Sequence, residues 1–137
     1  MRAGNGIVVA CQGAHGEKRE VSYRERGGGG AHILQICSGA LTRLAYGEQT
    51  VCQRLSLDAR GLEKLSTVLG WHEGALAGAT RFFADGDAVL ADMLDVCSRA
   101  GIVCTFCTVG SEAGMLSVSV GVSAAYGPSK PRLKLVP

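Results

Sequence analysis

The sequence predicts an α+β fold, with an antiparallel sheet of about five to seven strands and two or three helices packed on one face. Segments in which apolar and polar residues alternate are grouped before residue 58, and segments with helical spacing of apolar residues follow them. A last pair of strand-like segments comes after residue 101. Twenty of the 137 residues are glycine, which indicates many turns between these elements.

The first two strands are expected near the N-terminus. Ile7–Cys11 is a short apolar run that a turn follows. In Glu17–Arg26 the pattern alternates, so Val21 and Tyr23 are expected to face inward. The residues expected to face outward are Lys18, Glu20, Ser22 and Arg24. The glycine run 27–30 is interpreted as a flexible loop.

Three further strands are expected at hairpin spacing, and turn residues separate them. They are Ile33–Ser38, Leu41–Tyr46 and Thr50–Leu57. In the last of them one face carries Val51, Gln53, Leu55 and Leu57, and the opposite face carries Cys52, Arg54 and Ser56.

A helix is predicted next, which Ser56 or Asp58 can cap and Gly70 can end. Its apolar stripe is formed by Leu62, Leu65, Val68 and Leu69. The segment 71–84 also has apolar residues at helical spacing, but Gly74 and Gly78 disfavour a helix by about 1 kcal/mol each. A helix and a loop with one helical turn therefore both remain open for this segment.

The best-marked helix ends at Gly101. Asp85 or Asp87 is expected to cap its start, and Arg99 suits the negative end of its dipole. Its buried face is expected to carry Leu90, Met93, Leu94 and Cys97.

Two strands complete the predicted domain, Ile102–Val109 and Met115–Ser123. In the second strand apolar residues alternate with serine and glycine, so one face is buried and the other faces water or a partner. We expect residues 1–125 to form a single α+β domain. Residues 126–137, which hold Lys130, Arg132 and Lys134, are expected to form a loosely ordered basic tail.

The apolar runs of the chain are too short for a signal peptide or a membrane span. We therefore expect a cytoplasmic protein with no membrane partner, whose six cysteines are reduced thiols. The formal net charge is +2, but its distribution is uneven. Residues 73–112 carry two basic against six acidic side chains, whereas residues 1–72 carry nine against six. This asymmetry is compatible with a charged partner surface, with head-to-tail self-association or with an ordinary mixed surface.

Cys104 and Cys107 have the spacing of redox centres and of half a zinc site. A structural zinc ion needs two further ligands, and the chain has no second such pair. Within a strand, residues three apart point to opposite faces, so both sulfurs reach one site only across a β-bulge. Packing of both thiols in the core is therefore the main interpretation, and a thiol redox or metal site is an alternative.

Basic residues of the second strand offer a possible nucleic-acid face. The candidates are Lys18, Arg19, Tyr23, Arg24 and Arg43, with Tyr23 and Tyr46 available for base stacking. Several strands that lead into one amphipathic helix, over about residues 17–70, loosely resemble single-strand-binding transcriptional coactivators and Pur-type repeats. This resemblance rests on element order and implies single-stranded nucleic acid as a ligand. Three interleaved glutamates, Glu17, Glu20 and Glu25, favour instead a solvated strand with cross-strand ion pairs.

Candidate catalytic residues are not spaced as a constellation, and His15, His32 and His72 lie far apart in the chain. We therefore predict a non-enzymatic binding or regulatory module without a cofactor. It is expected to form a homo-oligomer or to bind a protein partner, since sheet edges and the serine-lined face of the last strand are open to contact. Two alternatives remain open, namely a single-stranded nucleic-acid-binding protein and a thiol redox or metal protein centred on Cys104 and Cys107.

Overall fold

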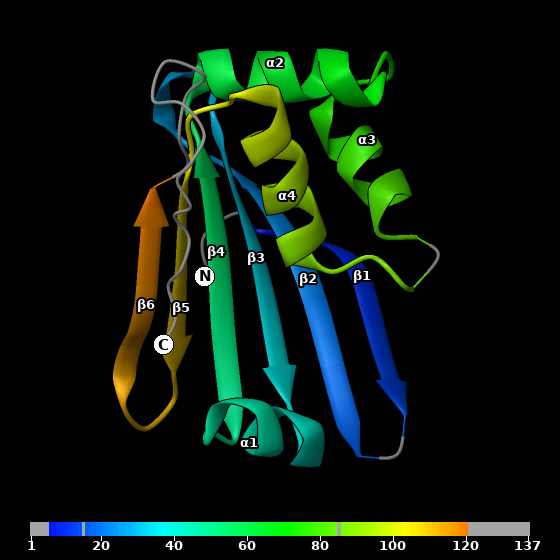
Figure 1. Ribbon diagram of the computed structural model, residues 1–137. Coiled ribbons are helices and arrows are strands. Elements are labelled where there is room, and N and C mark those ends of the chain that lie inside the picture. Colours follow the sequence, from blue (N-terminus) through cyan, green and yellow to red (C-terminus); the bar gives the residue numbers. More distant parts are fainter. Residues whose placement is uncertain (1–5, 15, 85, 121–137) are drawn as a thin grey trace.

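The computed structural model describes residues 6–14, 16–84 and 86–120 and has an α+β fold (Figure 1). Six strands form one sheet in the order β1-β2-β3-β4-β5-β6, and each strand is antiparallel to its neighbours. The strands are β1 (Ile7–Ala14), β2 (Glu17–Glu25), β3 (Ala31–Ser38), β4 (Thr50–Leu57), β5 (Thr105–Gly110) and β6 (Gly114–Val120). The predicted fold class is confirmed.

Three helices connect β4 to β5 and pack on one face of the sheet, whereas α1 lies at the sheet end where β3 turns into β4 (Figure 1). The helices are α1 (Ala40–Tyr46), α2 (Ala59–Leu69), α3 (Ala75–Phe82) and α4 (Leu90–Ala100). A 3₁₀ turn, Gly27–Gly29, joins β2 to β3. No described helix is long and apolar enough to cross a membrane.

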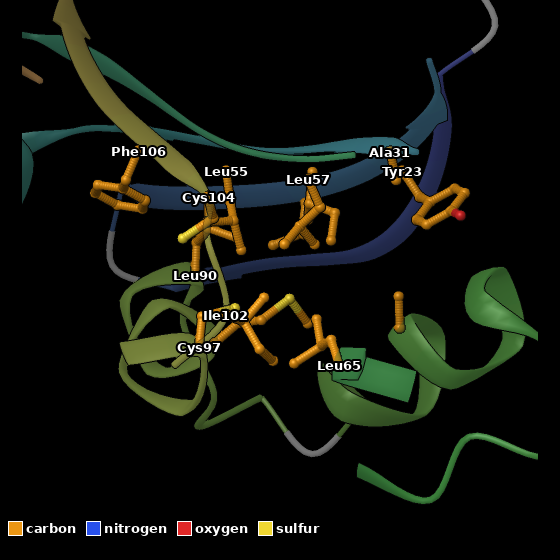
Figure 2. Packing of buried hydrophobic residues seen from close by; sticks show 14 of the residues in the cluster. Tyr23, Ala31, Leu55, Leu57, Leu65, Leu90, Cys97, Ile102, Cys104 and Phe106 are labelled. Atoms are coloured by element: carbon orange, nitrogen blue, oxygen red, sulfur yellow. The ribbon is translucent and has the colours of Figure 1, made fainter. Parts of the chain in front are cut away.

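The core lies between the three helices and the sheet (Figure 2). Strand alternation places Val51, Gln53, Leu55 and Leu57 on the helix side, as predicted, and all four are buried. The side chains that meet them include Leu65 of α2, Phe83 after α3, and Leu90 and Met93 of α4, and each of these has no exposed surface. Burying such a side chain contributes about 1.5–3 kcal/mol, so this layer holds the helices on the sheet.

Local signals set both ends of α2. The Asp58 carboxylate accepts a hydrogen bond from the Gly61 backbone N–H at 2.8 Å, and Gly70 ends the helix in a left-handed conformation. Of the two proposed caps, Asp58 is therefore the one used. Gly101 ends α4 in the same way, as predicted.

The start of α4 differs from the prediction. The helix begins at Leu90, so Asp87 lies too far upstream to cap it, and Asp85 lies outside the described residues. The Asp92 carboxylate accepts the Val89 N–H at 2.8 Å, and the buried Gln35 amide oxygen on β3 accepts the Leu90 N–H at 2.9 Å. Because Gln35 lies on a distant strand, the sequence around α4 contains no signal for this cap.

The predicted strand Leu41–Tyr46 is wrong, because this segment forms α1. The backbone turns at Gly39, whose φ of 129° favours glycine, and the helix then begins. Glu17 of β2 binds the free end of this helix: its carboxylate accepts the Leu41 N–H at 2.9 Å and also the Thr42 hydroxyl. These hydrogen bonds lower the pKa of Glu17, with the bond from Thr42 contributing most.

The strand β5 is shorter than predicted, whereas the predicted end of β6 at Ser123 lies outside the described residues. β5 begins at Thr105 rather than at residue 102, so Cys104 precedes the strand. A bulge shifts the register between Thr108 and Val109, which pair with Ser117 and Met115 and leave Leu116 unpaired. Residues 121–137 lie outside the described residues, so the predicted basic tail and the domain end at residue 125 stay predictions.

Segment 71–84, for which the sequence left both a helix and a loop as alternatives, contains α3. The position of this helix depends on one close contact. Trp71 is 7% exposed and packs on the buried Gly78 of α3. A Cβ atom at residue 78 would lie 2.2 Å from the indole ring, so glycine lets this helix approach Trp71.

Candidate functional site

The face of the sheet opposite α2, α3 and α4, here called the open face, is not covered by any described helix (Figure 1). Strand alternation and register place apolar side chains on this face along β1, β3, β5 and β6. They are Val8, Leu34, Ile36, Val109, Met115 and Val118. Four of them are well exposed, at 54% for Val8, 40% for Ile36, 59% for Met115 and 52% for Val118.

A basic cluster occupies one end of the open face. Arg24 of β2 pairs with His32 of β3, and Arg54 of β4 lies in the next row. The His32 Nδ1 and Ser56 Oγ atoms are 2.8 Å apart. Burial lowers the pKa of His32, and the positive charges of Arg54, Arg24 and Arg26 lower it further. The imidazole is therefore neutral at pH 7, whereas the guanidinium groups keep their charge.

The strands place more basic than acidic residues on this face. Lys18, Arg24 and Arg54 are the basic residues, and Glu20 is the one acidic side chain that the described strands add. Neither Arg24 nor Arg54 forms a salt bridge with a described residue. The open face therefore combines basic side chains on the inner strands β2 and β4 with exposed apolar side chains on β3 and on both edge strands.

The five residues predicted as a nucleic-acid face do not share one surface. Lys18 and Arg24 lie on the open face, but Arg19 lies on the helix side and donates to Gln12 Oε1 at 2.7 Å and to the Gly86 carbonyl. Tyr23 is 4% exposed within the core, so its ring is not accessible for stacking on a base. Arg43 lies on α1 and forms a salt bridge with Glu112 at 3.1 Å.

Sequence reasoning did not group Arg54 and His32 with Arg24. Alternation along β4 placed Arg54 on the face opposite Leu55, but only the strand order puts β4 beside β3 and one strand away from Arg24 of β2. The pairing partner of a strand across a long connection has no signal in local periodicity.

The two cysteines Cys104 and Cys107 lie on opposite sides of the sheet. Cys104 belongs to the core cluster beneath the helices, together with Phe106, whereas Cys107 pairs with Val118 and faces the open side. No disulfide joins any of the six cysteines, and no group of metal-ligating side chains occurs among the described residues. The structure therefore does not bring these two sulfurs into one site.

The thiol that does lie near Cys104 is Cys97. The sequence predicted Cys97 on the buried face of a helix but did not pair it with Cys104. Cys97 of α4 lies next to Cys104 in the core, and the two thiols are hydrogen-bonded (Figure 2). Both are buried, with 0% and 3% of their surface exposed. This hydrogen bond is the main cause of a strongly raised pKa at Cys97, and burial adds to it. Cys97 is thus held as a neutral thiol, which is a poor nucleophile and a poor metal ligand.

The outer surface of α4 is acidic and lies on the opposite side of the molecule from the basic cluster (Figure 1). Asp87, Asp92 and Asp95 are exposed along this helix and the segment before it, and Arg99 is the basic residue beside them. The uneven charge along the sequence therefore corresponds to two faces of different sign.

The chain has no significant match to a protein-family model, to a curated protein or to a solved structure.

Proposed function

We propose that this protein is a non-enzymatic binding module that associates with further copies of itself through its open face. The observation that carries this proposal is the exposure of Val8, Ile36, Met115 and Val118 on a sheet face that no described helix covers. One continuous row from β3 to β6 is formed by Ile36, Cys52, Val109 and Met115. Contiguous exposed apolar surface with polar neighbours is typical of a protein interaction site. A non-covalent contact there needs no catalytic group.

Charge complementarity indicates which surface of the second copy contacts the open face. The open face carries Lys18, Arg24 and Arg54, and the outer side of α4 carries Asp87, Asp92 and Asp95. Contact between these unlike surfaces is heterologous and attractive, and it repeats from copy to copy. Packing of two open faces on each other would instead bury Arg54 against apolar side chains, which is costly for a charge without a partner.

The size of the open face suits a weak and reversible association. Six strands spaced by about 4.8 Å and about eight residues long give roughly 24 by 26 Å, or about 600 Å² per copy. The total of about 1,200 Å² is at the lower limit for specific interfaces. We therefore expect assembly to depend on protein concentration and on salt.

Light scattering of charge-reversal variants tests this contact. The average mass of the unmodified protein is expected to rise with concentration at tens of micromolar. Arg54→Glu damages only the open face and Asp95→Arg damages only α4, so each variant alone is expected to remain a monomer. Their equimolar mixture retains one intact pair of surfaces and is expected to form dimers or larger species, because the two reversed surfaces also carry unlike charges.

Lys64→Glu is the matched control, because this exposed residue of α2 lies outside both surfaces. It is expected to assemble as the unmodified protein does. A monomeric unmodified protein at this concentration would refute self-association. A mixture that contains only monomers would refute the pairing of the open face with α4.

A second candidate function, the binding of single-stranded nucleic acid, is favoured by one observation. Arg24, Arg54 and Arg26 surround His32 at one end of the open face, and Lys18 lies on the same face. Guanidinium groups on a flat sheet match a phosphate backbone that crosses the strands. The proposal differs from the predicted face because Arg54 and His32 replace Arg19, Tyr23 and Arg43.

Fluorescence anisotropy of a labelled thymidine oligonucleotide tests this second candidate. Neutralising about three phosphates predicts that affinity falls roughly twentyfold when salt rises fourfold. Arg24→Glu is expected to abolish binding, whereas Arg43→Glu on α1 is expected to have little effect. An oligonucleotide that does not bind at low salt would eliminate this candidate.

A further inference from the structure

A groove of about 1320 Å³ lies on the helix side of the sheet, away from the open face. The start of β1, the end of β2 with the glycine-rich turn, and helices α2 and α3 form its walls (Figure 1). Ile7, Leu62 and Leu76 supply apolar wall, and Leu76 is 37% exposed. The groove is thus large enough and apolar enough to hold a small organic ligand.

Tyr23 places a polar group in this groove. The residue is only 4% exposed, yet its hydroxyl forms no hydrogen bond with any described residue. In Figure 2 its oxygen points away from Leu57 and the rest of the cluster. Burial raises the pKa of Tyr23, and the charge of Glu25 raises it further, so the phenol keeps its proton. A buried hydroxyl without a partner is costly, and a ligand acceptor would remove that cost.

The start of α3 supplies further donors to the same groove. Gly74 precedes the helix and has no side chain to cap it, and no other side-chain cap is present. The first-turn residues Ala75, Leu76 and Ala77 line the groove, and the backbone N–H groups of a first turn lack helical acceptors. The positive end of the helix dipole thus lies beside the buried hydroxyl.

The charges that line the groove limit the ligand to a single negative charge. Arg26 contributes a guanidinium that forms no salt bridge with a described residue, whereas Glu73 is neutralised by Arg81 at 3.1 Å. Glu25 adds an exposed carboxylate at the rim. The several negative charges of a phosphate-rich ligand would be repelled by Glu25, but one carboxylate can be matched by Arg26 and the helix N-terminus.

We propose that this groove binds a small monocarboxylate with an apolar body. Its carboxylate accepts hydrogen bonds from the Tyr23 hydroxyl and the free N–H groups of α3, and its body lies against Ile7, Leu62 and Leu76. The site shares no residue with the two surfaces proposed for self-association, so each proposal can be tested without the other.

Titration of the isotope-labelled protein with octanoate, followed by NMR, tests the site. Amide shifts are expected at Gly28, Leu62 and residues 75–77. Octanol and octylamine have the same body with a neutral and a cationic head group. We expect octanoate to bind about tenfold more tightly than either, which is the ratio that one charge-assisted hydrogen bond supplies.

Two variants separate recognition from folding. Tyr23→Phe keeps the ring and removes a hydroxyl without a partner, so it is expected to fold normally and to lose about tenfold in octanoate affinity. Arg26→Gln is expected to reduce the same affinity, and Arg60→Gln, an exposed change on α2 outside the groove, is expected to leave it unchanged. The proposal is overturned if octanoate causes no shifts at about ten millimolar, if octanol binds equally well, or if Tyr23→Phe binds as the unmodified protein does.

Discussion

Replacing Gly78 by alanine is expected to lower the free energy of unfolding by about 1–3 kcal/mol, because the new methyl group overpacks the core. A Cβ atom there would lie 2.2 Å from one carbon of the Trp71 ring and 2.3 Å from another, so either the indole or α3 must move. Helix propensity acts in the opposite direction and favours alanine by about 1 kcal/mol. The steric term decides the sign, since Trp71 is buried and has no free space to enter.

Urea unfolding measures this change, and the fluorescence of Trp71, the only tryptophan of the chain, reports where it occurs. Ala77→Gly on the exposed side of the same helix is the control, and it is expected to cost about 1 kcal/mol through propensity alone without altering the native fluorescence. If Gly78→Ala were instead more stable than the unmodified protein, the packing of Trp71 on α3 would be wrong.

The parts of the fold that the sequence predicted correctly depend on neighbouring residues. Val51, Gln53, Leu55 and Leu57 alternate along one strand, and Asp58 caps the helix that follows directly. Period and capping act over three or four residues, so a short window contains the whole signal.

The element that was predicted wrongly depends on a distant residue. Leu41 and Leu44 are 65% and 83% exposed, so the apolar residues that suggested a strand do not enter the core. Glu17, more than twenty residues earlier, instead binds the start of α1. The cap that Gln35 provides to α4 was missed because it, too, comes from a residue far away in the sequence. A hydrogen bond between distant segments depends on strand pairing, which periodicity does not contain.

For the candidate surfaces too, the sequence predicted what depends on neighbouring residues and missed what depends on the pairing of distant segments. The outward direction of Lys18 and Arg24 was predictable from β2 alone, but their association with Arg54 required the strand order. The spacing of Cys104 and Cys107 suggested a site, yet strand geometry separates them. The neighbour of Cys104 is Cys97, which the packing of α4 on the sheet brings close.

Replacing Glu48 by alanine is expected to release the β5–β6 hairpin and to lower the free energy of unfolding by about 1–3 kcal/mol. Glu48 is 4% exposed, and its carboxylate accepts the N–H groups of Glu112 at 2.7 Å and Ala113 at 3.0 Å. Gly110 leaves the space for this side chain, since a Cβ there would lie 2.4 Å from the carboxyl carbon. Removing the carboxylate relieves the cost of burying a charge, but it leaves two donors without an acceptor and empties this space.

The location of the effect distinguishes this role from a general loss of stability. β6 is an edge strand that pairs only with β5 among the described strands. In addition to the Glu48 hydrogen bonds, the turn before β6 is held to β4 by a hydrogen bond of 2.9 Å from the Ser111 N–H to the Thr50 carbonyl. Amide hydrogen exchange of Glu48→Ala is therefore expected to accelerate at residues 111–118 while β2 and β3 stay protected. Glu48→Gln keeps one acceptor oxygen, so its exchange rates at these residues should lie between those of the unmodified protein and those of Glu48→Ala. The control is Glu63→Ala on the exposed side of α2, which should change the free energy of unfolding by no more than about 0.5 kcal/mol. Exchange that accelerates equally in all strands would show that Glu48 supports the whole sheet rather than fixing this hairpin.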